Sequence, residues 1–389
     1  MKIRILSPFF SPELISTGRY NAFLSKVLAS RQHHIEIICL HPIYPTWQVQ
    51  PTHQQLEGAI AYRGGRYLIF PKNQYLRRII LEIAFASHAF FSMISMPKVD
   101  LVINVIPPSL FLPIAYPIQR LRAKKVVAIV HDLQGVYAER SEGRSRNFVG
   151  KIIQWIEKTG LKRMDQVVFL SQEMKTYCVK NYGLREESCV VHYPFATLKD
   201  QLTGCQDTLR EVLEFGKTNV VYSGALGEKQ NPDGVYSLMR KICEMDDTVR
   251  CHFFSAGPIF ERLKVRNDCE KIMFHPLVPE QDLASLYALS DIQIVPQAPG
   301  TSKGSMPSKL PNLVASRCKV LVVSDPGSEL SSICLNIPSI HCETHWDIPI
   351  LANKILEIAR QDAVDGESSQ FGMFSIESLV TDLTTMATP

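Results

Sequence analysis

Short β-branched hydrophobic runs alternate along the chain with longer amphipathic stretches, a pattern typical of alternating strands and helices. Lys2–Leu6 is a short β-rich run, and residues 19–29 place apolar side chains at helical spacing. The run IEIICL at residues 35–40 has the length and β-branching of a strand buried on both faces of a parallel sheet. The chain therefore opens as a βαβ unit, the start of a doubly wound α/β sheet.

This alternation continues and then begins a second time. Further strands are predicted in the first half at residues 100–105, 126–130, 166–170 and 190–194. After a polar, irregular stretch at 196–207, strands are predicted at 220–222, 251–255, 272–274, 292–295 and 320–323, with helices at 281–290 and 307–316 among them. Since 389 residues suffice for two domains, we predict two Rossmann-like doubly wound domains, 1–200 and 201–370. Within residues 371–389 we predict a helix that packs back toward the first domain.

Two apolar stretches stand out in the first half. Residues 79–96 approach the length of a membrane span, but they include Glu82, His88 and three serines, so we interpret them as a buried or half-embedded helix. Residues 105–118 contain four prolines, which argues against a straight helix. Both stretches are predicted to be core or interfacial.

The most informative stretch for function is VVYSGALGEKQ, residues 220–230. A strand is predicted to stop at Ser223-Gly224, and a loop containing Gly227 then carries Lys229 toward a helix beginning near Asn231-Pro232. Backbone N–H groups at such a turn, with a lysine beside them, suit a phosphate or diphosphate. An ordinary βα connection has the same pattern, so neighbouring features must decide between the two interpretations.

Charge is divided unevenly along the chain. The net charge of +4 combines +12 in residues 1–200 with −8 in residues 201–389. A basic half that also holds the apolar stretches fits an anionic lipid surface or an anionic substrate. The ten cysteines form no CxxC pair, and prolines interrupt the apolar N-terminal run, so we expect buried thiols, a reducing compartment and a cytoplasmic location. A nucleic acid is not expected as a partner.

Other candidate residues follow the predicted strands of the first half. Tyr44 and Trp47 lie in a proline-punctuated loop after the second strand, where they could contact an acceptor or close the loop on its own domain. His131 and Asp132 come directly after the strand at 126–130; either could face a ligand, or serve as a core histidine and a helix cap. Gly18 stands alone where a dinucleotide fingerprint needs three spaced glycines, which disfavours a hydride-transferring enzyme.

Taken in order, five segments resemble a known family. SPFFSPELISTGRYNAFL, IYPTWQV, VHDLQG, YSGALGEKQNPDGV and MPSKLPNLVAS are similar to segments of the GT-B glycosyltransferases of family 4, closest to the colanic-acid and exopolysaccharide branch. The resemblance implies two facing Rossmann-like domains with a cleft between them, the first binding an acceptor and the second a nucleotide-sugar. It also implies transfer with retention of anomeric configuration and no metal ion, and this chain has no Asp-x-Asp motif.

The resemblance also implies site residues. His131, Asp132 and Lys229 would be catalytic, and Tyr44 and Trp47 would lie on the acceptor side. The implied donor-binding residues are Gly18, Ser223, Gly224, Lys229, Ser308, Lys309, Leu310 and Asn312. No cofactor is implied, since the UDP- or GDP-sugar is a substrate. The expected acceptor is a polyprenyl-diphosphate-linked lipid or an oligosaccharide at the inner face of a membrane.

The chain departs from the family pattern at three positions. Ala225 stands where the family often has an arginine, and the paired glutamates fall on Gly304 and Asn312, of which Asn312 could still bind a ribose hydroxyl. These departures leave open a non-catalytic scaffold of a polysaccharide assembly complex. A UDP-GlcNAc 2-epimerase-like enzyme is the other alternative, and it would leave the basic, apolar N-terminal half unexplained.

Overall fold

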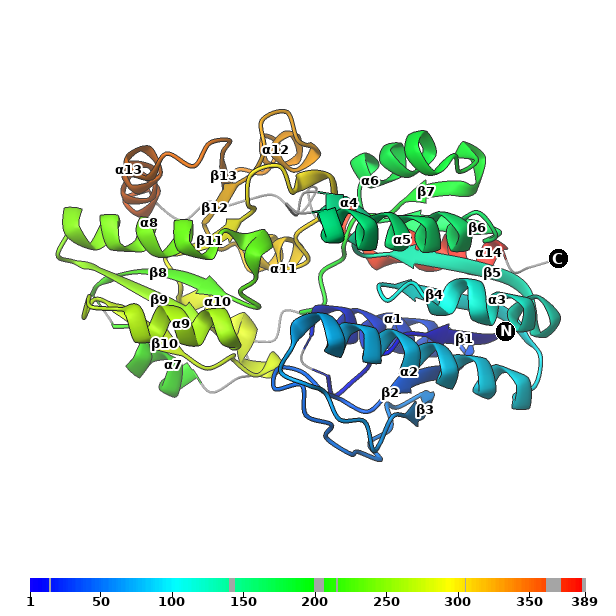
Figure 1. Ribbon diagram of the computed structural model, residues 1–389. Coiled ribbons are helices and arrows are strands. Elements are labelled where there is room, and N and C mark those ends of the chain that lie inside the picture. The colour runs from blue at the N-terminus through cyan, green and yellow to red at the C-terminus, as the bar shows by residue number, and fades with distance from the viewer. Residues whose placement is uncertain are drawn as a thin grey trace. The chain divides into compact units, whose positions relative to one another are not determined.

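The structure is a computed structural model that describes residues 1–13, 15–139, 144–198, 206–214, 216–304, 306–361 and 372–386. The chain forms two compact units, and each is described by itself. The first comprises Met1–Tyr193, Lys303–Met306 and Ser375–Pro389, and the second comprises Pro194–Ser302 and Pro307–Phe374. Each unit has its own parallel sheet with helices on its faces (Figure 1).

The first unit contains a seven-stranded parallel sheet in the order β3-β2-β1-β4-β5-β6-β7. Its strands are β1 (Lys2–Leu6), β2 (His34–Leu40), β3 (Ala59–Gly64), β4 (Val99–Ile106), β5 (Ala123–Val130), β6 (Gln166–Phe169) and β7 (Cys189–Val191). Its helices are α1 (Ser16–Ser30), α2 (Gln74–Ser95), α3 (Phe111–Arg122), α4 (Gln134–Glu139), α5 (Arg144–Leu161), α6 (Gln172–Tyr177) and α14 (Ile376–Met386). The strand order reverses between β1 and β4, so ligands are expected at the carboxyl ends of these strands.

The second unit contains a six-stranded parallel sheet in the order β10-β9-β8-β11-β12-β13. Its strands are β8 (Thr218–Ser223), β9 (Val249–Phe254), β10 (Ile272–His275), β11 (Ile292–Pro296), β12 (Val320–Val323) and β13 (Ile340–Glu343). Its helices are α7 (Gln206–Val212), α8 (Pro232–Met245), α9 (Pro258–Arg266), α10 (Leu283–Leu289), α11 (Leu310–Ala315), α12 (Glu329–Cys334) and α13 (Ile348–Ala359). Here the order reverses between β8 and β11.

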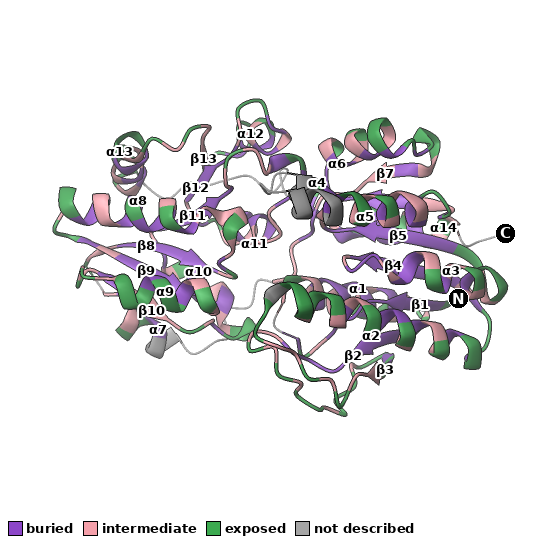
Figure 2. Ribbon diagram, in the orientation of Figure 1, coloured by how far each residue is buried: buried purple, intermediate pink, exposed green. Residues whose placement is uncertain are grey.

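The cores explain why these elements form. The central strands of both sheets are buried while the outer faces of the helices are exposed (Figure 2). In the second unit α8 and α13 pack together through apolar residues at helical spacing, among them Val235, Met239, Leu351 and Ile355. The C-terminal helix α14 belongs to the first unit, where Glu377 pairs with Arg31 and the carboxylate of Asp382 lies 2.9 Å from Nε2 of His192.

Two features of the structure were not part of the sequence predictions. The edge strands β3 and β13 were not predicted. Buried and exposed positions alternate along β3, so its sequence has no long apolar run that would mark it as a strand. The four prolines argued against a straight helix over residues 105–118, and no helix was predicted there; the structure has α3 from Phe111 to Arg122, with Pro117 inside it. Pro113 falls in the first turn, where no intrahelical N–H donor is required, and Pro117 removes only one bond.

Candidate active site

The stretch singled out in the sequence lies at the switch point of the second sheet. β8 ends at Ser223, and the residues Ser223–Gln230, here called the donor loop, follow it. β8 is bonded to β9 on one side and β11 on the other, so the loop starts where the order of strands reverses. In open α/β sheets, ligands bind at this position.

Backbone carbonyls of the donor loop are tied to their own unit. The Gly224 carbonyl accepts from Oγ of Ser255 at 2.7 Å, and the Ala225 carbonyl accepts from the Tyr222 hydroxyl at 2.6 Å. Oγ of Ser223 donates to Oε1 of the buried Gln293 at 3.0 Å. These bonds fix the path of the loop before any ligand arrives.

Gly224 allows the chain to turn here. Its φ of +122° lies in a region that side chains rarely adopt, and a Cβ built on it would meet nothing within 4 Å. Its N–H donates to the Phe254 carbonyl at 2.9 Å, whereas the N–H groups of Ala225 and Leu226 donate to no other group in the described part of the chain. The backbone N–H groups of Ala225 and Leu226 are therefore available to bind an anion, and there is space beside Gly224.

Lys229 follows in a short turn, Glu228–Gln230, and is half-buried. Its backbone carbonyl accepts from the N–H of Ala298 at 2.7 Å, which anchors the turn beside the end of β11. Helix α8 begins only after Asn231, whose side chain caps the N–H of Gly234. The predicted start of this helix is confirmed. Because Asn231 already caps the N-terminus of α8, Lys229 lies in the turn before the helix and not in its first turn.

Lys309 lies under the donor loop. Its Nζ donates to the carbonyls of Ile294 at 2.6 Å and Ser223 at 3.3 Å, and sits 4.5 Å from the centre of the Tyr222 ring. Burial lowers the pKa of this amine to about 7. The amine thus links β8 and β11 near their carboxyl ends. Direct contact between Lys309 and a nucleotide-sugar stays a prediction, because the amine would have to leave these two carbonyls to make it.

The other predicted donor residues on this side have structural contacts of their own. Oδ1 of Asn312 accepts from the N–H groups of Thr197 and Leu198 at 2.7 and 3.1 Å, so its side chain is engaged with the segment that opens the second unit. The Leu310 side chain is fully buried, and Ser308 is half-buried in the turn that leads into α11. Their contacts with a donor stay predictions.

In the first unit, His131 follows β5 at the carboxyl edge of the sheet. Its ring meets that of Tyr20 edge-on, with centroids 4.4 Å apart, and the backbone N–H of His131 donates to the Ile106 carbonyl. Burial lowers the pKa of His131 to about 4, so the imidazole is neutral near pH 7. Within the described residues its Nε2 has no hydrogen-bond partner, although it is buried. A neutral ring nitrogen of this kind suits a hydrogen bond to a ligand.

The sequence interpretation did not single out Glu157, which supports this region. Its buried carboxylate accepts from the N–H groups of Gln134 and Gly135, at the start of α4, and from the Tyr182 hydroxyl at 2.6 Å. Burial raises the pKa of Glu157 to about 7. Because α4 follows His131-Asp132 directly, Glu157 helps to fix the half-buried Asp132 and its neighbours.

Glu13 was also missed, and it joins two loops at the same edge. Its buried carboxylate accepts from the N–H groups of Ile43 and Tyr44, both at 2.9 Å. A Cβ on Gly18 would lie 3.0 Å from Cβ of Glu13 and 3.1 Å from its carbonyl oxygen. A side chain at position 18 would therefore crowd the loop of Glu13 where α1 passes it, and the approach of Gly18 to a donor stays a prediction.

Trp47 closes its loop on its own unit. The ring packs edge-on against Phe70, with centroids 5.5 Å apart, and the Arg77 guanidinium lies 4.4 Å from its centre. The sequence left open whether this loop contacts an acceptor or closes on its own domain, and the structure shows Trp47 packed on its own unit. Acceptor binding by Tyr44 or Trp47 stays a prediction.

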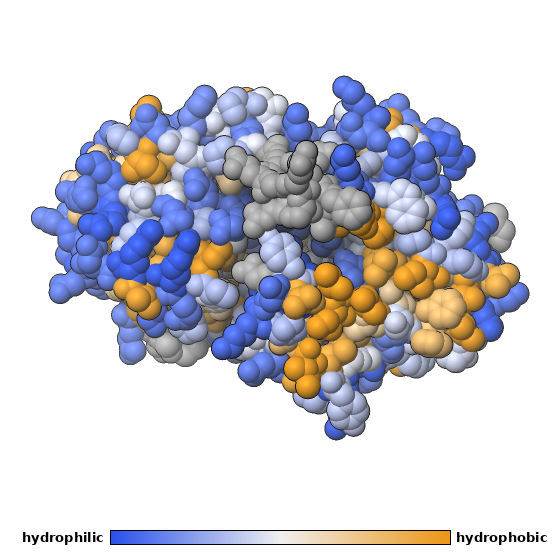
Figure 3. Space-filling model, viewed as in Figure 1, coloured by the Kyte–Doolittle hydropathy of each residue, from blue (hydrophilic) through white to orange (hydrophobic). Residues whose placement is uncertain are grey.

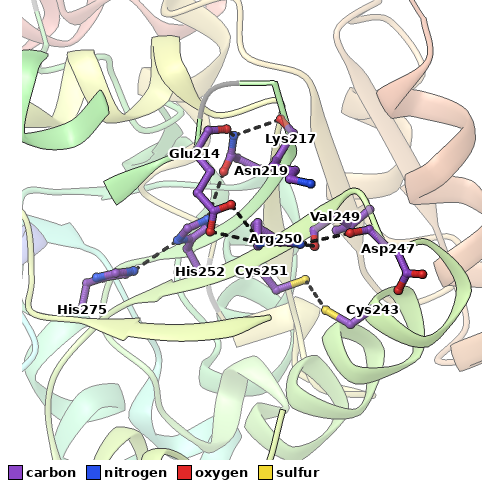
Figure 4. Close-up of polar contacts among 10 residues, drawn as sticks. All are labelled: Glu214, Lys217, Asn219, Cys243, Asp247, Val249, Arg250, Cys251, His252 and His275. Atoms are coloured by element: carbon purple, nitrogen blue, oxygen red, sulfur yellow. Dashed lines mark hydrogen bonds and ion pairs between the residues drawn. The ribbon is translucent and has the colours of Figure 1, made fainter. Parts of the chain in front are cut away.

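A second polar cluster lies on β9 and is structural (Figure 4). Nε2 of His252 lies 3.1 Å from Oδ1 of Asn219, and its Nδ1 lies 3.2 Å from Nε2 of His275. Burial lowers the pKa of His252 to about 3. His252 is fully buried and bonds to strands β8 and β10, so the cluster ties three strands together.

Comparison with solved structures defines the class of the fold. Sucrose-phosphate synthase from Thermosynechococcus elongatus superposes with a TM-score of 0.74 at 15% identity, covering 99% of this chain and 98% of that chain. WaaG, a glycosyltransferase involved in lipopolysaccharide biosynthesis, superposes with a TM-score of 0.61 at 12% identity, covering 100% and 95%. The fold is therefore GT-B, and the prediction of two Rossmann-like doubly wound units is confirmed.

Sequence comparison then gives the family. Residues 17–198 match Glycosyltransferase Family 4. WcaI of Escherichia coli (strain K12), provisionally described as a colanic acid biosynthesis glycosyl transferase, is 24% identical over 363 residues, which is 87% of each chain. This chain is a glycosyltransferase of the GT-B fold, and residues 17–198 belong to Glycosyltransferase Family 4. The resemblance noted in the sequence is confirmed.

Proposed function

We propose that the protein is a retaining, metal-independent hexosyltransferase that moves a sugar from a UDP- or GDP-sugar to a lipid-linked or saccharide acceptor. The process would be the synthesis of exopolysaccharide or another cell-surface polysaccharide, as the description of WcaI suggests for that relative. The location would be cytoplasmic, peripheral on the inner face of a membrane, with the basic N-terminal half, +12 over residues 1–200, facing anionic lipid.

The observation that carries this proposal is the donor loop. Its carbonyls are held by Tyr222 and Ser255, while two amides remain at the switch point, close in sequence to Lys229. A diphosphate leaving group gains negative charge as the bond to the sugar breaks. Donors that are already fixed in place stabilise that charge most in the transition state, which accelerates the reaction.

Each proposed residue has a role that its surroundings allow. Lys229 would supply positive charge to the leaving diphosphate, and Lys309 would hold the two strand ends beneath the loop. His131 would present neutral Nε2 to the sugar or acceptor, since its low pKa prevents it from acting as a cation near pH 7. The diphosphate would take the acceptor proton, so no nucleophile from the protein is required.

Substitution of Lys229 tests the proposal. We expect Lys229→Ala to lower sugar transfer, or donor hydrolysis, by about 10² to 10³ fold, the usual effect of removing one donor to a developing charge. Lys264→Ala removes an exposed lysine from α9 in the same unit and serves as the matched control. Equal turnover of the two variants, both folded, would show that the donor loop is not the donor site.

A further inference from the structure

Helix α2 has an apolar outer face that no described part of the chain covers. Its inner face is buried in the first unit through residues such as Phe85, Ala89 and Met93. The opposite face, here called the outer stripe, presents Ile79, Ile83, Phe91 and Ile94, which are 52%, 53%, 68% and 42% exposed, with one exposed serine, Ser87, between Ile83 and Phe91. A surface helix normally carries polar residues on its outer face, so this helix is apolar where water would be expected.

The exposed apolar surface continues beyond the N-terminal end of the helix. Tyr75 and Leu76 open α2, and Tyr67 and Ile69 in the preceding loop are almost fully exposed. In the space-filling view, hydrophobic side chains gather over α2 (Figure 3). Contiguous apolar patches of this kind mark surfaces that bind something less polar than water.

Basic residues flank the stripe at both ends. Lys72 and Arg78 are exposed near its N-terminal end, and at the other end the guanidinium of Arg122 donates to the Ile94 carbonyl at 2.8 Å. Between Glu57 and Asp100 the sequence holds six basic residues and one carboxylate. That carboxylate, Glu82, accepts from the N–H groups of Ser109 and Leu110 in the turn before α3, which leaves basic residues as the other charged groups of this segment.

The basic residues around the outer stripe indicate what kind of partner covers it. A second copy of the chain would bring two basic rims together, which like-charge repulsion disfavours. A membrane span is also disfavoured: α2 is long and apolar enough to cross a bilayer, but its inner face forms part of a protein core. An apolar helix face with Lys and Arg at its ends instead fits the boundary between acyl chains and anionic headgroups.

We propose that α2 is a monotopic anchor, lying in the plane of an anionic bilayer with Ile79, Ile83, Phe91 and Ile94 among the acyl chains. This proposal does not depend on the proposed function, because the exposed apolar face of α2 is there whether or not the acceptor is lipid-linked. It specifies which surface meets the lipid, and adds apolar insertion to the electrostatic attraction of the basic half. Binding should therefore fall only partly at about 1 M salt, where the Debye length is about 3 Å.

Vesicle binding tests the anchor. The full chain is sedimented with vesicles of phosphatidylcholine and phosphatidylglycerol, and with vesicles of phosphatidylcholine alone. We expect wild type to prefer the anionic vesicles, and Ile83→Glu with Phe91→Glu to lower binding at least tenfold. Phe91→Leu should bind like wild type because it keeps the apolar surface. Val265→Glu, at an 87% exposed position in the second unit, is the matched control and should have no effect.

Several results would overturn the anchor. Absence of wild-type binding, equal binding by the double variant, or full loss of wild-type binding in high salt would each refute it. A wild-type dimer that the double variant separates would identify the stripe as a protein interface instead. Because both altered side chains are exposed, the variants should melt like wild type. Thermal stabilisation by UDP or GDP, measured on the same samples, reports on the proposed function separately: its absence alongside vesicle binding would refute the enzyme and keep the anchor.

Discussion

The buried imidazole of His252 makes the stability of the protein depend on pH. His252 bonds to Asn219 and His275 inside the second unit, and burial lowers its pKa from 6.5 to about 3. The unfolded chain binds a proton at this residue as the pH falls through 6.5, whereas the folded chain does not until about pH 3. Stability from neutral His252 is therefore complete above pH 6.5 and is lost progressively as the pH falls toward 3.

The size of the effect follows from these pKa values. At pH 5 the solution is about 1.5 pH units below the pKa of His252 in the unfolded chain, so protonation stabilises the unfolded state but not the folded state. At about 1.4 kcal/mol per unit, this costs about 2 kcal/mol of the free energy of unfolding. Burial shifts His131 in the same direction, while the raised pKa values of Glu82 and Glu157, both about 7, act in the opposite direction. The contribution of His252 must therefore be isolated by difference.

The variant His252→Gln isolates it, because the amide keeps one donor and one acceptor and does not titrate. Urea denaturation between pH 5 and pH 8 should show that the variant loses about 2 kcal/mol less than wild type on acidification. His53→Gln changes an exposed histidine in the same way and should match wild type. Parallel curves for wild type and His252→Gln would refute the claim that His252 stays neutral in the folded protein.

Three further results are expected. Arg4 is fully buried with its Nε 2.9 Å from Glu36, so Arg4→Ala should lower the free energy of unfolding by about 3 to 5 kcal/mol in urea titrations, whereas a loss below about 1 kcal/mol would mean that the pair is hydrated. Gly224→Ala should lower stability by about 1 kcal/mol and weaken nucleotide binding, because φ is +122° there; calorimetric titration with unchanged affinity would contradict this. Proton NMR of the first product should show the anomeric configuration of the donor sugar, and inversion would refute the retaining mechanism.

The sequence predicted the fold well where strands are buried on both faces. Residues 126–130 and 320–323 are uninterrupted apolar runs rich in valine and isoleucine, and both lie in strands that have a neighbouring strand on each side. The edge strand β3 alternates buried and exposed positions over only a few residues and ends in Arg63-Gly64, so its signal is weak. The prolines of residues 105–118 argued only against a straight helix, and α3 forms there because Pro113 falls in the first turn, which tolerates it.

The site could be predicted only in part, for a physical reason. Glycines and a lysine after a strand are visible within one short segment, and they correctly predicted a strand that ends in a loop at residues 223–230; donor binding by this loop stays a prediction. The amine of Lys309, however, lies between carbonyls of two strands, and Asn312 bonds to residues 197 and 198, more than a hundred positions earlier. Glu13 and Glu157 likewise cap backbone N–H groups more than twenty residues away. Such long-range partners are set by the tertiary fold, and a single sequence shows no local sign of them.

The central claim is that the donor loop binds the diphosphate of a nucleotide-sugar, and the thermal shift caused by UDP and GDP tests it most directly. A ligand at a hundred times its dissociation constant stabilises the folded state by about 2.7 kcal/mol. We predict that one of the two nucleotides raises the melting temperature of wild type and Lys264→Ala and leaves that of Lys229→Ala nearly unchanged. No shift in wild type at millimolar nucleotide, or equal shifts in all three proteins, would contradict the claim.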